Sequence, residues 1–200
     1  MRIFATILGI GLALAACQKV ADGTFARYHH LQENPIRVIM PPTAPYMSQQ
    51  YRRLPPELAR ERDVRDHLAI DVQAPLGTPV LAVAPGRVTR VQTGPAYGKR
   101  VELTHAPDAQ GKSIVTRYFH LDSQTVVEGQ TVARGEQIGT LGHSGFLAGT
   151  LDHLHYSVIQ AGRAEDPNRF WVEGIGRVTC FDPSASYDEQ VFAATYPVGC

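Results

Sequence analysis

The chain has 200 residues, of which 44% are hydrophobic, with 19 basic and 19 acidic side chains. This length is sufficient for one domain with a buried core and short extensions. The charges balance and form no basic tail or like-charge run, which argues against nucleic acid as a partner. The composition carries no indication of oligomeric state.

The N-terminus predicts export from the cytoplasm. Arg2 precedes an uncharged apolar run over residues 3–16, which is shorter than the roughly 20 residues that cross a bilayer. Residues 1–16 therefore have the features of a signal peptide. The run ends in Leu-Ala-Ala-Cys at Cys17, which resembles the lipobox of bacterial lipoproteins and implies a lipid anchor on that cysteine. Ordinary cleavage after Ala15 is the alternative and would leave a soluble secreted protein.

Two segments connect this signal to the rest of the chain. Residues 17–45 have turn formers and little periodicity, which predicts a tether. Residues 51–66 are rich in charge, and two prolines followed by residues 57–62 predict a short helix with proline at its start. We expect this helix to be either a wall of a binding groove or an ordinary solvated surface helix.

His67 and Asp71 are the first pair of candidate metal ligands. In an extended strand they would lie about 13 Å apart, at about 3.3 Å per residue. Two side chains that each bind zinc at about 2 Å could barely span that distance. The backbone therefore curls between them, or His67 lies on a loop that enters a strand beginning near Ile70.

The central part of the chain predicts a mainly β fold of antiparallel strands with short helices and loops. Short apolar segments alternate with glycine and proline, and no stretch has the length and periodicity of a core helix. We expect strands at residues 79–84, 87–92, 100–104, 114–120, 137–141 and 153–159. Hairpin turns are expected at residues 95–98 and 107–111. The loop at residues 145–151 leads into the last strand and is expected to form the rim of a cleft.

The last of these strands contains His153 and His155. Residues two apart on a strand point to the same face, and the residues between and after them alternate as in a half-buried strand. Both histidines are therefore expected to face one cleft. Two imidazoles and a carboxylate match a catalytic zinc site, which takes three protein ligands and leaves the fourth position to water.

Six motifs in this order resemble the lysostaphin-like, or LytM-type, zinc endopeptidases, which cut the peptide part of bacterial peptidoglycan. They are the segments His67–Asp71, Gly77–Val80, Gly86–Val88, Tyr118–Leu121, Gly129–Gly135 and His153–Tyr156. Two positions depart from the family pattern. Ala69 replaces the usual glycine, which is tolerated unless the backbone there needs a positive φ. Asp152 stands where proline is common and adds a carboxylate near the expected cleft.

The resemblance implies a role for each site residue. It makes His67, Asp71 and His155 the ligands of one Zn²⁺ per chain, and it makes His120 and His153 the catalytic histidines. Which of these two is the general base stays open. Taken alone, His120 would be read as a strand-end histidine capped by a backbone carbonyl. Copper or nickel fits the same ligands in principle, but zinc suits an amide hydrolase.

The implied architecture is a LytM-type peptidase domain over residues 46–165, followed by an extension over residues 166–200 that packs on it. The implied function is hydrolysis of peptide cross-links in peptidoglycan, with stem peptides and a membrane as partners. The bond cut stays open between glycine–glycine and D-alanine–diaminopimelate links. The alternatives are a non-hydrolytic LytM-type module that binds or activates other cell-wall hydrolases, and an envelope zinc carrier. In a two-membrane bacterium, Gln18 after the lipidated cysteine permits sorting to the outer membrane, facing the periplasm.

The remaining cysteines and histidines have structural interpretations. Apart from Cys17, the chain has Cys180 and Cys200, and an even remainder in an exported chain suggests a disulfide. Closing that loop would stabilise the fold by roughly 3 kcal/mol in the chain-entropy model. His105 is expected at a strand end and His143 in a turn, without a clear chemical role.

Overall fold

The structure is a computed structural model that describes residues 35–55 and 66–200. The predicted signal peptide, the lipid anchor at Cys17, most of the tether and the short helix over residues 57–62 lie outside the described residues. Within the described ranges, no helix has the length and apolar character needed to cross a membrane.

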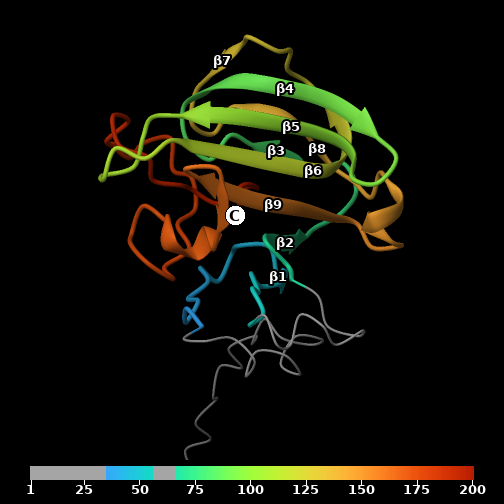
Figure 1. Cartoon of the computed structure of the whole chain (residues 1–200), viewed down its shortest axis with the longest axis horizontal. Coiled ribbons are helices and arrows are strands. Elements are labelled where there is room, and N and C mark those ends of the chain that lie inside the picture. The colour runs from blue at the N-terminus through green and yellow to red at the C-terminus, as the bar shows by residue number, and fades with distance from the viewer. Residues whose placement is uncertain (1–34, 56–65) are drawn as a thin grey trace, which may run out of the picture.

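An antiparallel sheet of ten strands forms the body of the protein, which confirms the predicted fold class (Figure 1). The strands are β1 (Met47–Gln49), β2 (Ile70–Gln73), β3 (Pro79–Leu81), β4 (Gly86–Gly94), β5 (Gly98–His105), β6 (Ile114–Gln124), β7 (Thr131–Val132), β8 (Gln137–Leu141), β9 (His153–Gln160) and β10 (Arg163–Glu165). Their main order across the sheet is β1-β2-β9-β6-β5-β4-β7. β10 pairs with β9, while β8 pairs with both β3 and the end of β6.

The six strands expected over residues 79–159 are all present, with ends that differ by a few residues. The first is shorter than expected and ends at Leu81, because the next residues bond elsewhere. The amide of Ala82 donates to the carbonyl of Glu136, and the amide of Val83 donates to the hydroxyl of Tyr118. Helix is limited in the described residues to two single 3₁₀ turns, η2 (Phe146–Ala148) and η3 (Pro167–Arg169).

The core lies on one face of the central strands, because apolar residues occupy every second position there. On β9, Leu154, Tyr156 and Val158 are buried, and the histidines between them point to the other face. Complete burial of such side chains stabilises the fold by roughly 1.5–3 kcal/mol each. The sheet therefore presents its polar face, with His153 and His155, to the candidate site.

The C-terminal extension, residues 166–200, packs on the core face. Trp171 and Tyr196 are buried in the same core cluster as the strands. The amide of Thr195 donates to the carbonyl of Val83. A disulfide joins Cys180 to Cys200, with their Cα atoms 5.9 Å apart. The extension is thus part of the folded body.

Residues just before the predicted domain boundary at residue 46 also contact this body. Ile39 forms a backbone bridge with Arg177. Val38 and Met40 pack against the core, and the carbonyl of Pro45 accepts a hydrogen bond from the hydroxyl of Tyr196. The segment from residue 38 to residue 45 is thus attached to the sheet and the extension by hydrogen bonds and partly buried side chains.

Candidate metal centre

His67 is positioned by a backbone bridge before β2. Its amide and carbonyl pair with the carbonyl and amide of Arg52 at 2.8 and 2.7 Å. The strand itself begins at Ile70, which confirms that His67 lies on a segment entering the strand. Ala69 is buried, and it is not among the described residues with a positive φ. The exchange of glycine for alanine is therefore accommodated without backbone strain.

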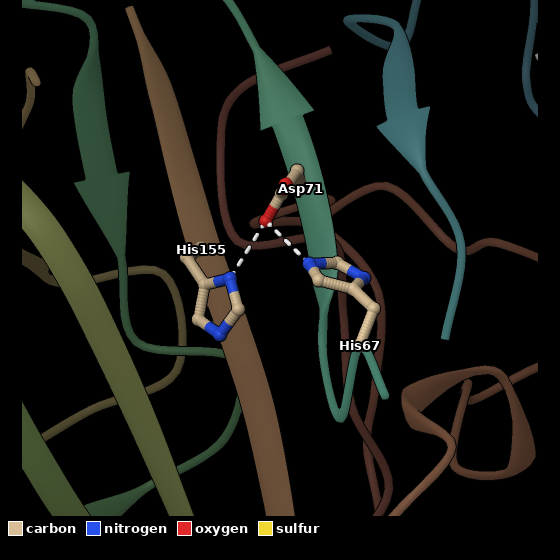
Figure 2. Close-up of side chains that lie close together, drawn as sticks. All are labelled: His67, Asp71 and His155. Atoms are coloured by element: carbon tan, nitrogen blue, oxygen red, sulfur yellow. Dashed lines mark hydrogen bonds and ion pairs between the residues drawn. The ribbon is translucent and has the colours of Figure 1, made fainter. Parts of the chain in front are cut away.

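Figure 2 shows that the side chains of His67 and Asp71, from the segment that enters and forms β2, converge with that of His155 on β9. Asp71 lies directly opposite His155 in the pairing of β2 with β9. The carboxylate Oδ1 of Asp71 is 3.2 Å from Nε2 of His67 and 2.8 Å from Nδ1 of His155. The donor atoms of the three side chains all lie within 4.8 Å of one another. Such a set can hold one metal ion.

The contacts around these donors orient the rings. Nδ1 of His67 lies 2.9 Å from the carbonyl oxygen of Gln50. A carbonyl only accepts hydrogen bonds, so Nδ1 carries the proton and Nε2 faces the cluster. Histidine ligands commonly donate their second N–H in this way, which fixes the tautomer and the ring orientation.

The electrostatics of the cluster favour an ionised Asp71 and neutral histidine at His155. Burial alone would raise the pKa of Asp71, but its contacts with the imidazoles of His155 and His67 together hold it well below its usual range. Burial lowers the pKa of His155, against the opposing effect of Asp71. A carboxylate and an unprotonated imidazole are the forms that bind metal.

His120 and His153 lie beside the three converging side chains. Their ring centroids are 4.9 Å apart, and the ring of His120 is 5.8 Å from that of His155. Nδ1 of His120 donates to the carbonyl of Ser144, and Nδ1 of His153 donates to the carbonyl of Leu151, each at 2.9 Å. In the neutral rings, Nε2 is therefore left as an acceptor. Nε2 of His153 is 3.9 Å from Oδ2 of Asp71.

The backbone of His120 is unusual, with a φ of 62°. A positive φ is uncommon for residues other than glycine, and such conformations persist where the surroundings hold them. The amide of His120 donates to the carbonyl of Tyr97, and its carbonyl accepts from the amide of Ser144. Burial lowers the pKa of His120 to about 4, against the opposing effect of the Ser144 carbonyl. The ring is thus neutral near pH 7 and held in one orientation.

A cleft of about 390 Å³ contains all five of these side chains. Its polar lining includes Ser48, Gln49 and Gln73 from β1 and β2. Its apolar lining includes Leu147, Ala148 and Leu151. The loop over residues 145–151 therefore forms part of the rim, as expected from the sequence.

Tyr97 is a lining residue that the sequence did not single out. It lies in the turn between β4 and β5, and its ring centroid is 4.9 Å from that of Phe119 and 6.1 Å from that of His120. It also lines the cleft. An exposed aromatic residue at a hairpin tip was the available signal, but only the folded sheet brings that tip to the histidines.

Three other polar residues, His105, His143 and Asp152, do not line the cleft. His105 ends β5 and is buried, with its nitrogens 2.8 Å from the carbonyl oxygen of Pro85 and 2.7 Å from the hydroxyl of Thr116. Asp152 was expected near the cleft, but its carboxylate pairs with Nδ1 of His143 at 2.6 Å. Neither Asp152 nor His143 lines the cleft. Both sit on exposed loops where an ion pair with water access is the favoured arrangement.

Comparison with known proteins gives matches over this same region. The sequence pattern of peptidase family M23 matches residues 65–167. The peptidoglycan DD-endopeptidase ShyA of Vibrio cholerae serotype O1 is 38% identical over 112 residues, which are 56% of this chain and 24% of ShyA. The uncharacterized lipoprotein YgeR of Escherichia coli K12 is 33% identical over 102 residues, covering 50% of this chain and 38% of YgeR.

A solved structure shares the fold. The crystal structure of a zinc-containing peptidase from Vibrio cholerae superposes with a TM-score of 0.52 and 29% identity, covering 67% of this chain and 39% of that chain. The matched region thus spans about a quarter of ShyA and less than half of the solved protein.

Proposed function

The chain belongs to peptidase family M23, and from this we propose that it is a zinc-dependent endopeptidase that hydrolyses peptide cross-links in bacterial peptidoglycan. The observation that carries the proposal is the convergence of His67, Asp71 and His155 in one cleft. The cleft also contains His120 and His153 with their Nε2 atoms left as acceptors.

The donor set fits zinc. Two imidazoles and one carboxylate provide three protein ligands, as in catalytic zinc sites. The carbonyl of Gln50 orients His67, and Asp71 is held ionised. When bound, zinc lowers the pKa of a coordinated water and polarises the scissile carbonyl.

The protein supplies the proton transfers. Amide hydrolysis needs a group that accepts a proton from the attacking water and a group that delivers one to the leaving amine. We assign these transfers to His120 and His153, whose rings flank the ligand cluster. Nε2 of His120 is left as an acceptor, and the hydrogen bond from Nδ1 to the carbonyl of Ser144 favours the protonated ring once a proton has been taken up.

The apolar rim and the polar lining suit a peptide substrate that lies across the cleft. Leu147, Ala148 and Leu151 offer contacts for small aliphatic side chains such as that of alanine. Ser48, Gln49 and Gln73 offer hydrogen-bond partners for the peptide backbone. The DD-endopeptidase name of ShyA supports a cross-link between D-centres as the bond cut.

We also propose that the protein acts in the cell envelope, held through a lipid on Cys17 at the periplasmic side of the outer membrane. The lipobox-like sequence before Cys17 supports this, as does the lipoprotein name of YgeR. The disulfide between Cys180 and Cys200 fits an oxidising compartment. Mass spectrometry of the membrane-associated protein should find diacylglycerol on Cys17, whereas an unmodified N-terminus at residue 16 or 17 would refute the anchor.

Digestion of purified cell-wall sacculi tests the activity. Zinc-loaded protein is expected to convert cross-linked muropeptide dimers into monomers. The products are separated by liquid chromatography and identified by mass spectrometry. The variant His120→Ala should retain zinc and lose the cleavage. Persistence of the dimers with zinc-loaded wild-type protein would overturn the endopeptidase proposal and favour the non-hydrolytic regulatory module.

A further inference from the structure

A cluster of charged side chains, here called the arginine cluster, lies over the middle of the sheet. It consists of Arg90 on β4, Arg100 and Glu102 on β5, and Arg117 on β6. The Nε atoms of the arginines lie 3.7, 3.7 and 3.5 Å from the carboxylate oxygens of Glu102. Strand register sets this arrangement, because Glu102 lies directly opposite Arg90 on one side and Arg117 on the other.

The charges in the arginine cluster do not balance. Three guanidinium groups surround one carboxylate, which leaves a net charge of +2 (three minus one). All three distances exceed the 2.7–3.2 Å of an N–H···O hydrogen bond. The Nε atoms of Arg100 and Arg117 are buried and have no hydrogen-bond partner. Buried donors without acceptors are unfavourable, so Glu102 satisfies the cluster only in part. Arg90 and Arg100 also donate to the side-chain oxygen of Gln92. An anion can reach the exposed parts of Arg90 and Arg117.

The side chains of Arg90 and Arg117 are 51% and 39% exposed, whereas that of Glu102 is 10% exposed. The positive charge is therefore accessible from solvent, and the neutralising carboxylate lies beneath it. Guanidinium groups bind carboxylates through paired hydrogen bonds and are weakly hydrated, which makes them suited to this ligand.

The arginine cluster and the metal centre occupy the same face of the sheet. Arg117 and Phe119 are two residues apart on β6, so their side chains point to one face. Phe119 lies directly opposite His155 in the pairing of β6 with β9, and their ring centroids are 5.5 Å apart. Figure 1 shows β5, β6 and β9 side by side. With strands about 4.8 Å apart, β5 lies roughly 10 Å from β9.

We infer that the arginine cluster binds free carboxylates of the acidic stem peptide whose cross-link is presented to His67, Asp71 and His155. This inference rests on the proposed function. Across the sheet, β5 lies roughly 10 Å from β9 and roughly 14 Å from β2, which corresponds to about three or four extended residues, so one stem peptide reaches both sites. Stem peptides carry free carboxylates beside the cross-linked residue, which matches the sign of the cluster. The cluster thus selects acidic stems over stems whose carboxylates are amidated.

Calorimetric titration of the zinc-loaded full chain tests this inference. The two probes are an acidic stem tetrapeptide with free carboxylates and the same tetrapeptide with its side-chain carboxylates amidated. The test variant is Arg90→Gln/Arg117→Gln, which leaves Arg100 to pair with Glu102. The control variant is Arg163→Gln/Arg177→Gln, which removes the same charge from residues outside the cluster.

Wild-type protein and the control variant are expected to bind the acidic peptide about fivefold more tightly than the amidated peptide, from two partly exposed charge pairs. Arg90→Gln/Arg117→Gln should bind both peptides alike. A preference that survives in this variant, or no preference in wild-type protein, would overturn the inference. If the double variant melts at a lower temperature than wild-type, Arg117→Gln alone should lose about half of the preference on a logarithmic scale.

Cleavage separates this inference from the proposed function. If wild-type protein prefers the acidic peptide but leaves cross-linked dimers intact, the inferred binding site is supported and the endopeptidase proposal is refuted. If wild-type protein cleaves acidic and amidated dimers with the same KM, the endopeptidase proposal is supported and the inferred binding site is refuted.

Discussion

The buried imidazole of His105 makes the stability of the fold depend on pH. Burial lowers the pKa of His105 from 6.5 to about 4, although the carbonyl of Pro85 opposes the shift. In the unfolded chain, His105 takes up a proton near pH 6.5, but in the folded protein it stays neutral until about pH 4. The unfolded state therefore binds more protons in this window, and stability is lost as the pH falls.

The size of this effect follows from the shift. At 1.36 kcal/mol per pKa unit, the change from 6.5 to about 4 corresponds to a loss of about 3 kcal/mol when the pH falls through the window. A small domain has a total stability of roughly 5–15 kcal/mol. The protonation of this one side chain in the unfolded chain therefore removes a sizeable share of the stability.

The assay is urea unfolding of wild-type protein and His105→Gln at pH 7.5 and pH 4.5, with chelator present throughout. The variant lacks the titrating group, so it does not lose stability through this protonation. The amount by which its free energy of unfolding falls below that of wild-type protein should therefore be roughly 2–3 kcal/mol smaller at pH 4.5 than at pH 7.5. His143→Gln, a change at an exposed histidine that pairs with Asp152, serves as the control, and its deficit should not become smaller at pH 4.5. An unchanged deficit at the two pH values would refute the reasoning, as would a His105 imidazole that titrates near 6.5 by NMR.

Three further predictions concern the site and the extension. Zinc at about 100 times its Kd should raise the free energy of unfolding by about 3 kcal/mol, as measured by thermal or urea unfolding, and His155→Ala should abolish this gain. Replacing His120 or His153 by alanine should lower the cleavage rate by about 10²–10⁴-fold while bound zinc stays at one per chain by elemental analysis; an unchanged rate would remove that histidine from the mechanism. Arg134 is buried, and its guanidinium contacts Glu189 and the carbonyls of Val83 and Ala193. Because Glu189 is 39% exposed, the main effect of Arg134→Ala is the loss of the hydrogen bonds to the two carbonyls. This should cost about 1–3 kcal/mol in urea unfolding, and an unchanged free energy of unfolding would contradict this role.

The strands could be predicted because their signal is local. Alternation at β9 placed Leu154 and Tyr156 in the core and both histidines on the opposite face, and the structure has this arrangement. Strands β1, β7 and β10 have only two or three residues each. At that length alternation carries no information, and pairing with a neighbour defines the strand.

The site was accessible to sequence reasoning only in part. The side chains of His67 and Asp71 converge because the backbone of Arg52, fifteen positions before His67, holds that residue outside the strand. The contacts of Tyr97 with Phe119 and His120 also depend on strands that are distant in sequence. Likewise, nothing local predicted the positive φ of His120, which depends on hydrogen bonds to Tyr97 and Ser144.

The arginine cluster shows the same limit. Its members are spaced along three strands, and in the sequence they read as ordinary exposed charges. The register of β4 and β6 against β5 brings them around Glu102. Strand pairing therefore creates a local excess of positive charge, even though the chain has equal numbers of acidic and basic residues.

The central claim is that hydrolysis depends on one metal ion held by His67, Asp71 and His155. The most direct measurement is the rate of cleavage of a purified cross-linked muropeptide dimer as zinc is added back stepwise to chelated protein. The rate should be zero without metal and rise in proportion to bound zinc up to one ion per chain. Cleavage at full rate by the chelated protein, or none at one zinc per chain, would contradict the claim.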